Sequence, residues 1–387
     1  MQSKKMGFNT VCTHYGEIED TQFQGAISPI YLSTSYAFDN VDTKRYPRYF
    51  NTPNQESLCK KIAKLEHGEA ALIFGSGMAA VSTTLFAFLK HGDHIVLQRN
   101  IYGGTANLVN EEFDKHGIEY TYVDVTNAET VSKAIKKNTK VLYIETPSNP
   151  LLSVIDIEAI ANTGKKHNIL TVIDNTFASP VNQNPILMGI DIVIHSATKY
   201  LGGHSDILAG AVVASEEHMD TIFQVAKNFG GSLSDFTVWM LERSIKTLGI
   251  RVKQQNQNAQ EMAEWLQNHS DIDQVYYPGL PSHPDHAIAK KQMRGYGGML
   301  SFELQPGLDA SKFQAQLSLI KSSMSLAGVE STILSPTLTS HALLSEQERA
   351  DQGIKDGLLR FSVGIEEVED LKQDITAALE VLKKEYA

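Results

Sequence analysis

Short apolar runs alternate with amphipathic stretches from residue 55 to about residue 248. The apolar runs predict buried strands at residues 70–74, 94–97, 140–144, 170–173 and 191–194. Between them, the spacing of apolar residues predicts helices at residues 79–89, 107–116, 128–136 and 157–167. This alternation predicts an α/β fold whose mainly parallel sheet is covered by helices on both faces. Ligands of such folds bind at the carboxyl ends of the strands.

The two ends of the chain have other patterns. The first 54 residues are rich in Ser, Thr, Tyr, Pro and Asn, and they predict an extended arm that another surface must order. An amphipathic helix is predicted from Gln55 to the stop signal Gly68. Later elements are a long polar helix at 252–269, strands near 296–304 and 357–363, and a closing helix at 368–384. The predicted parts are an arm (1–54), a large domain (55–248) and a smaller C-terminal α+β domain (249–387).

The composition is that of a folded protein, with 42% hydrophobic and 20% charged residues. The net charge is −11 and no basic run is present, which argues against a nucleic acid partner. Cys12 and Cys59 stand far apart and outside any ligand spacing, so neither a disulfide framework nor a zinc site is predicted. No run approaches the roughly 20 apolar residues of a membrane span, and no export signal is visible. We expect a cytoplasmic protein without membrane contact.

Two of the predicted buried strands end in residues of particular chemistry. Asp174 closes the segment TVID before NT, and Lys199 closes the segment DIVIHSATK. Alone, an aspartate at a strand end is more often a helix cap, and a lysine is more often solvated. Together, the hydroxyls of Ser196 and Thr198 stand beside an amine, which fits a phosphate and an aldehyde on one ligand. The amine can form an imine with pyridoxal phosphate, and a carboxylate favours its protonated ring nitrogen.

A second candidate anion site lies at Gly75–Ala80, where a strand, a glycine turn and a helix start follow one another. Backbone N–H groups at such a helix terminus attract phosphate. The sequence GSGMAA also fits the loose G-x-G-x-x-A fingerprint of dinucleotide-binding oxidoreductases. That alternative requires an acidic residue at the end of the next strand, where this chain has Arg99. NAD is therefore disfavoured as the cofactor.

His195 and His204 flank Lys199, and histidine is common in metal sites and catalytic triads. No second set of ligands stands at a zinc spacing, and no serine lies in a G-x-S-x-G turn. We therefore predict structural roles for both histidines and no metal site.

The order of many short motifs resembles the trans-sulfuration enzymes of cysteine and methionine metabolism, which include cystathionine synthases and lyases. The resemblance covers nearly the whole chain and implies the fold-type I architecture of pyridoxal-phosphate enzymes. The motifs that carry it are PIY (29–31), YPR (46–48), GSGM (75–78), YGGT (102–105), ETPSNP (145–150), DNT (174–176), SATKYLGGHSD (196–206), SL (325–326) and LRFSVGIE (359–366).

The resemblance implies a role for each matching cofactor residue. Lys199 is the Schiff-base lysine and proton shuttle, Asp174 holds the ring nitrogen, and Tyr102 stacks on the ring. A lone tyrosine at a strand end is more often half-buried packing, so this role rests on the resemblance. The remaining cofactor-binding residues of the same subunit are Ser76, Gly77, Met78, Thr176, Ser196 and Thr198. Of these, Gly77, Met78, Ser196 and Thr198 hold the phosphate by the resemblance.

The resemblance also implies a shared site and a substrate site. Tyr46 and Arg48 on the arm complete the site of a neighbouring subunit, in a tetramer built of two dimers; a mobile tail is the alternative. Arg360 grips the carboxylate of an amino-acid substrate in a two-pronged pair, which the planar guanidinium favours. Asn149 and Ser325 assist it, and Tyr46 also contacts the substrate.

The implied reaction begins when Lys199 removes the α-proton of the substrate. Loss of a thiol from the β-carbon then yields pyruvate and ammonia. Loss from the γ-carbon yields 2-oxobutyrate, or replacement by an incoming thiol. We favour a carbon–sulfur lyase acting on cystathionine or a related sulfur amino acid. The alternatives are cystathionine γ-synthase or O-acyl-homoserine sulfhydrylase, methionine γ-lyase, and a non-catalytic homologue that binds the cofactor.

Several positions depart from the better-known patterns of the family. Met324 and Arg45 stand where related γ-enzymes often have acidic residues, which removes a match for the distal ammonium of cystathionine. The arm reads NTPN (51–54) where Asn-Pro-Thr is common. Methionine γ-lyases typically have a cysteine at the position of Gly104, which argues against that activity. A non-catalytic homologue is disfavoured because Lys199, Asp174 and Arg360 are all present.

Overall fold

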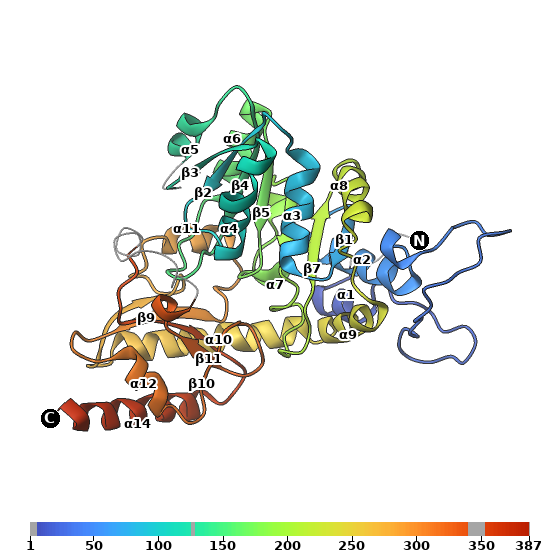
Figure 1. Ribbon diagram of the computed structural model, residues 1–387. Helices are drawn as coiled ribbons and strands as arrows, with labels where there is room; N and C mark the ends of the chain where they lie inside the picture. Colours follow the sequence, from blue (N-terminus) through green and yellow to red (C-terminus); the bar gives the residue numbers. More distant parts are fainter. Residues whose placement is uncertain (1–5, 125–127, 340–352, 387) are drawn as a thin grey trace. The chain divides into compact units, whose positions relative to one another are not determined.

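The computed structural model describes residues 6–124, 128–339 and 353–386, with side chains as far as residue 384 (Figure 1). The chain divides into two compact units. Unit 1 comprises residues 1–99, 104–145 and 156–250, and unit 2 comprises residues 100–103, 146–155 and 251–387. The first five residues of the predicted arm lie outside the described residues, and the three-part division predicted from the sequence stays a prediction.

Unit 1 is built on one sheet, in which the described residues form seven strands in the order β1-β7-β6-β5-β4-β2-β3. Strands β2 to β6 pair in parallel, whereas β7 pairs antiparallel with both β6 and β1. The strands are β1 (Ala70–Phe74), β2 (His94–Gln98), β3 (Glu119–Val123), β4 (Thr139–Glu145), β5 (Leu170–Asp174), β6 (Ile192–His195) and β7 (Gly210–Ala214). The predicted α/β class with a mainly parallel sheet is confirmed.

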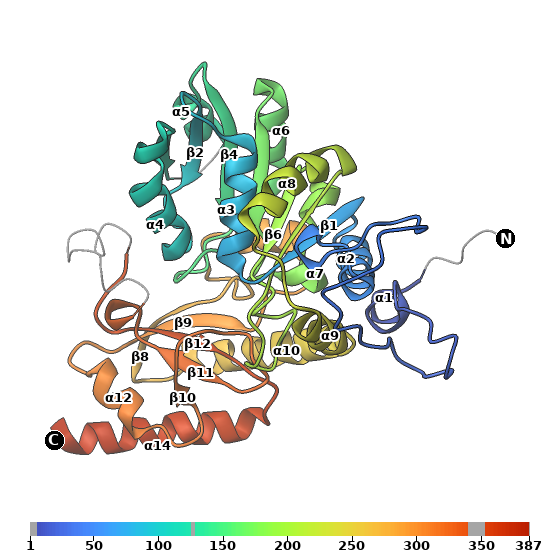
Figure 2. The same cartoon turned by 45° about the vertical axis from the view of Figure 1, so that its right-hand side comes forward.

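Helices cover both faces of this sheet. Figures 1 and 2 show α5 and α6 on one face and α3, α4 and α8 on the other. The helices are α3 (Gly77–Phe88), α4 (Gly103–Glu112), α5 (Ala128–Ala134), α6 (Ile157–His167), α7 (Ser179–Asn182), α8 (Glu216–Phe229) and α9 (Asp235–Ile245), with short 3-10 turns at Asp114–His116 and Pro185–Met188. Right-handed crossovers between parallel strands place α3 and α4 on one face and α5 and α6 on the other, because the chain reverses its direction across the sheet after β3.

The N-terminal segment is more structured than its composition indicates. Helix α1 (Phe8–His14) and a 3-10 turn (Pro47–Tyr49) lie within it, so the prediction of an arm without periodic structure is wrong there. Helix α2 (Pro53–Glu66) follows, with Thr52 and Gln55 forming a capping box at its start. Between α1 and the 3-10 turn the chain forms no helix or strand and exposes large apolar side chains, among them Phe23, Leu32 and Phe38.

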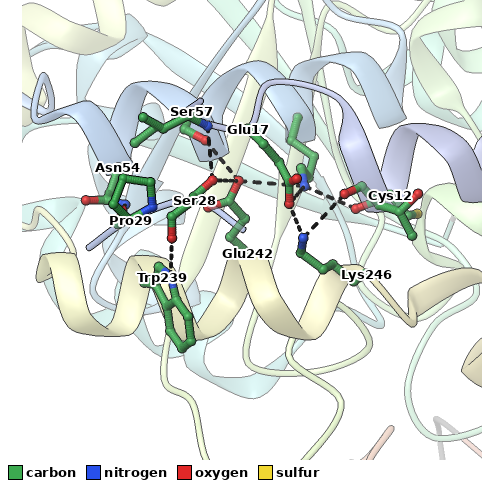
Figure 3. Close-up of polar contacts among 12 residues, drawn as sticks. Cys12, Glu17, Ser28, Pro29, Asn54, Ser57, Trp239, Glu242 and Lys246 are labelled. Carbon is green, nitrogen blue, oxygen red and sulfur yellow. Dashed lines mark hydrogen bonds and ion pairs between the residues drawn. The ribbon is translucent and has the colours of Figure 1, made fainter. Parts of the chain in front are cut away.

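A buried polar network fixes the beginning of the arm on α2 and α9 (Figure 3). Its centre is the fully buried Lys61 of α2, whose Nζ lies 3.6 Å from a carboxylate oxygen of Glu17 and 3.6 Å from one of Glu242. The same ammonium donates to the carbonyl oxygen of Cys12 at 3.1 Å, and Lys246 forms a second ion pair with Glu17. Lys61 and Glu242 are desolvated. Removing the positive or the negative side chains of this network would therefore leave buried charges of the other sign uncompensated.

Unit 2 is an antiparallel-rich sheet packed against long helices, in agreement with the predicted α+β pattern of the C-terminal part. The sheet order is β10-β11-β12-β9-β8. Leu266, Phe302, Phe361 and Leu379 are completely buried in its core. The elements are α10 (Leu248–Gln267), β8 (Ile272–Tyr276), α11 (His286–Gln292), β9 (Met299–Leu304), α12 (Ala310–Gln316), β10 (Lys321–Ser322), β11 (Thr332–Leu334), a 3-10 turn (Pro336–Leu338), β12 (Leu358–Ser362) and α14 (Val368–Tyr386).

The amides of α10 have a structural explanation. Gln255 donates to the carbonyl oxygen of Gly328 at 2.8 Å, and Asn258 donates to the carbonyl oxygens of Gly364 and Glu366 at 3.1 and 2.8 Å. These amides are buried and satisfy loop carbonyls that no strand pairs. In the part of the chain that the structure describes, no helix has both the length and the apolar character that crossing a bilayer requires.

Candidate active site

Strands β5 and β6 end side by side and bring three predicted site residues together. Asp174 is the last residue of β5, and Ser196 follows the last residue of β6. Thr176 connects them, because its N–H donates to Oδ1 of Asp174 at 2.9 Å and its hydroxyl oxygen accepts from the N–H of Ser196 at 2.8 Å. The carboxyl ends of the parallel strands therefore carry these residues, at the edge where ligands of such folds bind.

The start of α3 approaches the same edge. Ser76 is the N-cap of this helix, and its hydroxyl oxygen accepts from the N–H of Ala79 at 3.0 Å. A Cβ atom at Gly77 would lie 2.9 Å from Cβ and 3.0 Å from Oγ of Ser196, so only glycine allows this approach. The first residues of α3, which include Met78, and the hydroxyl of Ser196 thus lie around one position. Helix N–H groups and a hydroxyl are donors suited to an anion such as phosphate.

Thr198 and Lys199 lie in the turn after β6. The hydroxyl of Thr198 donates to the carbonyl oxygen of Ala209 and accepts from its N–H, both at 3.1 Å. This hydroxyl therefore holds the turn against the strand that follows, and its contact with phosphate stays a prediction. The backbone N–H of Lys199 donates to the carbonyl oxygen of Ser196 at 3.0 Å, which places the lysine one turn beyond the serine.

The carboxyl group of Asp174 is the buried charge of this edge, with 7% of the residue exposed. Burial raises its pKa, because an ionised carboxylate loses hydration there. Hydrogen bonds from Thr176, and then the electrostatic effects of His195 and Lys199, act in the opposite direction on that pKa. A cation placed against Asp174 would compensate the lost hydration.

Tyr46 and Arg48 lie on the exposed surface of the arm. The guanidinium of Arg48 stacks 5.6 Å from the ring centre of Tyr46 and 5.2 Å from that of Tyr49, and donates to the carbonyl oxygen of Lys227 at 2.6 Å. The side-chain oxygen of Asn51 accepts from the N–H of Tyr46 at 2.9 Å. The two predicted residues are therefore presented together in an ordered turn.

Arg45 helps to order the same turn. Its guanidinium forms an ion pair with Glu56 of α2 at 2.9 Å and donates to the carbonyl oxygen of Asn51. Arg45 stands where related enzymes often have an acidic residue. Its positive charge is paired with Glu56 of the same unit.

Unit 2 brings together the predicted substrate residues. Arg360 lies on β12 with 6% exposed, and donates to Oδ1 of Asn149 at 3.1 Å and to the carbonyl oxygen of Ser325 at 3.0 Å. The backbone carbonyl of Ser325 is thus one of the groups that orient Arg360, and a role of Ser325 in substrate binding stays a prediction. Burial lowers the pKa of Arg360 to about 10, and the nearby Tyr102 opposes this shift. The group remains a cation at neutral pH, held in a plane by two acceptors.

One buried residue of this region was missed by the sequence reasoning. Glu66 ends α2 with its side chain completely buried, and its Oε1 lies 2.6 Å from Nε2 of His195. An acidic residue in the last turn of a helix opposes the helix dipole, and this unfavourable position was the available signal.

The chain has close relatives among known proteins. A family model described as Cys/Met metabolism PLP-dependent enzyme matches residues 9–380. A cystathionine beta-lyase of Lactococcus lactis subsp. cremoris is 44% identical over 370 residues, which are 95% of this chain and 97% of that protein. A cystathionine gamma-lyase of Bacillus subtilis is 43% identical, also over 95% of this chain and 97% of that protein.

A solved structure has the same fold over nearly the full length. It is a cystathionine gamma synthase from Xanthomonas oryzae pv. oryzae in complex with aminoacrylate and cysteine, with a TM-score of 0.94 and 38% identity, and it covers 98% of this chain and 100% of that chain. The fold and the site define a fold-type I enzyme that uses pyridoxal phosphate. The chain belongs to the Cys/Met metabolism family of these enzymes.

The residues of unit 1 fit this cofactor. Asp174 is a buried carboxylate whose raised pKa marks the position where a cationic ring nitrogen would be stabilised. Ser76, Gly77 and Ser196 surround a position with the donors that a phosphate requires. Lys199 would supply the amine for the aldehyde group. The predicted family, fold class and cofactor are confirmed.

Proposed function

We propose that the protein is a carbon–sulfur lyase that eliminates a thiol from cystathionine or a related sulfur amino acid, and releases a keto acid and ammonia. The similarity to proteins named cystathionine beta-lyase and cystathionine gamma-lyase supports this reaction class. The single observation that carries it is the buried Arg360, fixed by Asn149 and Ser325, because a planar cation in such a frame fits the α-carboxylate of an amino acid.

Each residue of the site has its own role in the proposed reaction. Arg360 binds and orients the carboxylate of the substrate. Lys199 binds the cofactor and then holds and moves the α-proton at its Nζ atom. Asp174 keeps a positive charge on the ring nitrogen. The bound cofactor supplies the electron-withdrawing ring that makes the α-proton acidic. Tyr102 is proposed to pack against that ring.

Replacement of a γ-substituent by a thiol is the second candidate reaction. The observation that favours it is the side chain of Met324, which is 71% exposed and carries no charge beside the Ser325 turn. An uncharged residue there offers no counter-charge to the distal ammonium of cystathionine, which favours replacement by a thiol without an amino group. The structural match to a protein named cystathionine gamma synthase supports replacement as a reaction class. The lyase forms its product from cystathionine alone, whereas γ-replacement requires an added thiol.

The keto acid released from L-cystathionine distinguishes these reactions. The purified, cofactor-loaded enzyme is incubated with L-cystathionine, and the product is identified by mass spectrometry. We expect pyruvate if cleavage is at the β-carbon and 2-oxobutyrate if it is at the γ-carbon. Absence of both, with product formed from an O-acyl-homoserine and a thiol, would establish γ-replacement and contradict the lyase.

The arm is proposed to complete the site of a neighbouring subunit in a tetramer of two dimers, and the compartment is proposed to be the cytoplasm. Two features support the assembly, the exposed, ordered cluster of Tyr46 and Arg48 and the exposed apolar side chains of the arm. A monomer would leave these apolar side chains in contact with water. Sedimentation equilibrium should give a mass of four 42.7 kDa chains. A monomer that retains full activity would contradict the shared site.

A further inference from the structure

The buried carboxylate of Glu66 has three hydrogen-bond donors around it. Its Oε1 lies 2.6 Å from Nε2 of His195 and 2.7 Å from Nδ2 of Asn175, and its Oε2 lies 3.1 Å from Nδ2 of Asn184. Burial of an ionised carboxylate costs free energy unless donors replace the lost water. The side chain of Glu66 is 0% exposed, so these three donors take the place of the lost water.

Two of these donors stand next to the cofactor residues in the sequence. Asn175 directly follows Asp174 at the end of β5, and His195 directly precedes Ser196 at the end of β6. A single carboxylate therefore joins the ends of the two strands that carry the ring-nitrogen and phosphate contacts. A change at Glu66 is therefore expected to alter the separation of Asp174 and Ser196 through Asn175 and His195.

The amide of Asn175 is oriented from its other side as well. Its oxygen accepts from Nε2 of Gln183 at 3.0 Å, and its nitrogen donates also to the carbonyl oxygen of Gln183 at 3.2 Å. These hydrogen bonds hold the side chain of Asn175, next to Asp174, in one orientation, as a preorganised site requires.

His195 also has an electrostatic effect on Asp174. It lowers the pKa of that carboxyl group, against the larger effect of burial. The carboxylate of Glu66 contacts Nε2 of the same imidazole and so orients the ring.

We propose that Glu66 and His195 are a pair of positioning residues that holds Asp174 and Ser196 at the separation required by the cofactor and, through the imidazole of His195, favours the ionised carboxylate of Asp174. This inference rests on the proposed cofactor contacts. The pair touches neither substrate nor cofactor and acts through the residues adjacent to it.

The test measures how much pyridoxal phosphate the holoenzyme retains after dialysis at a series of pH values, read from its visible absorbance. The variants are Glu66→Gln, His195→Gln and the double variant with both changes. The double variant removes both members of the buried pair and so leaves neither one uncompensated. We therefore expect it to fold even if one of the single variants fails to fold. The control is Glu303→Gln, a buried glutamate of unit 2 that accepts from Tyr276 and Lys355.

We expect the dissociation constant of the cofactor to rise about tenfold in the double variant, the ratio that corresponds to one charge-assisted hydrogen bond. The pH at which half of the cofactor is lost should also move upward, because without His195 the pKa of Asp174 is higher and its carboxylate is protonated sooner on acidification. Glu303→Gln should change neither value.

A double variant with the retention and the pH midpoint of the unmodified enzyme would overturn the positioning role. A lower retention with an unchanged midpoint would overturn the electrostatic half of the proposal. If the unmodified enzyme itself retains no cofactor, the proposed function fails, which is a different result from failure of the pair.

Discussion

Replacement of Lys199 by alanine is expected to remove both the visible absorbance of the bound cofactor and the lyase activity. The amine is the group that bonds to the aldehyde of the cofactor and moves the α-proton, so kcat should fall by about 10³-fold or more. The loss is measured by absorbance of the dialysed protein and by keto acid release from L-cystathionine.

Lys372→Ala is the matched control for this change. Lys372 is a partly buried lysine of α14 that pairs with Glu261 and Glu369, and none of these three residues is a proposed cofactor contact. It should retain absorbance and activity. Reduction of the unmodified holoenzyme with borohydride, followed by digestion and mass spectrometry, should locate the cofactor on the peptide with Lys199. A label on another lysine, or absorbance that survives Lys199→Ala, would refute the assignment.

Replacement of Arg360 by lysine is expected to weaken substrate binding strongly while the cofactor stays bound. Lysine keeps the charge, but its ammonium cannot form the two parallel hydrogen bonds of a guanidinium with a carboxylate. KM for the amino-acid substrate should rise about 100-fold, the order expected when a buried, hydrogen-bonded charge pair is damaged. Steady-state kinetics with the best substrate measures the change.

Asn149→Ala provides the graded comparison, because it removes one of the two acceptors that fix the guanidinium. Its KM should rise by about tenfold, the size of one hydrogen bond to a charged group. The visible spectrum should be unchanged in both variants. An Arg360→Lys enzyme with unchanged KM would show that another group binds the carboxylate.

The elements that the sequence predicted well are those with strong local signals. Helix α6 was predicted at 157–167 and spans Ile157–His167, because Asp156 caps its start and Asn168 ends it in the left-handed conformation. Strand β3 was missed because it lies at the edge of the sheet and is only partly buried, so its residues show no continuous apolar run. Strand β7 was missed because its five residues include small ones with a weak pattern.

The candidate site was predictable only where the motif itself carries the chemistry. Lys199, Asp174 and Arg360 are such positions. Glu66 is not, because its partners lie 109, 118 and 129 residues away in the sequence, and only the folded chain brings them together. In the same way, the hydrogen bond from Arg360 to the carbonyl oxygen of Ser325 depends on the path of the backbone, which no motif specifies.

Helix α2 connects two regions that the motifs describe separately. Lys61 in its middle holds the beginning of the arm through Glu17 and Glu242, and Glu66 at its end holds the strands behind the cofactor. Unwinding of this helix would expose the buried charges of both regions at once. The helix, the arm and the strand ends therefore open as one cooperative unit, and amide hydrogen exchange in α2 should occur only with opening of the cofactor site.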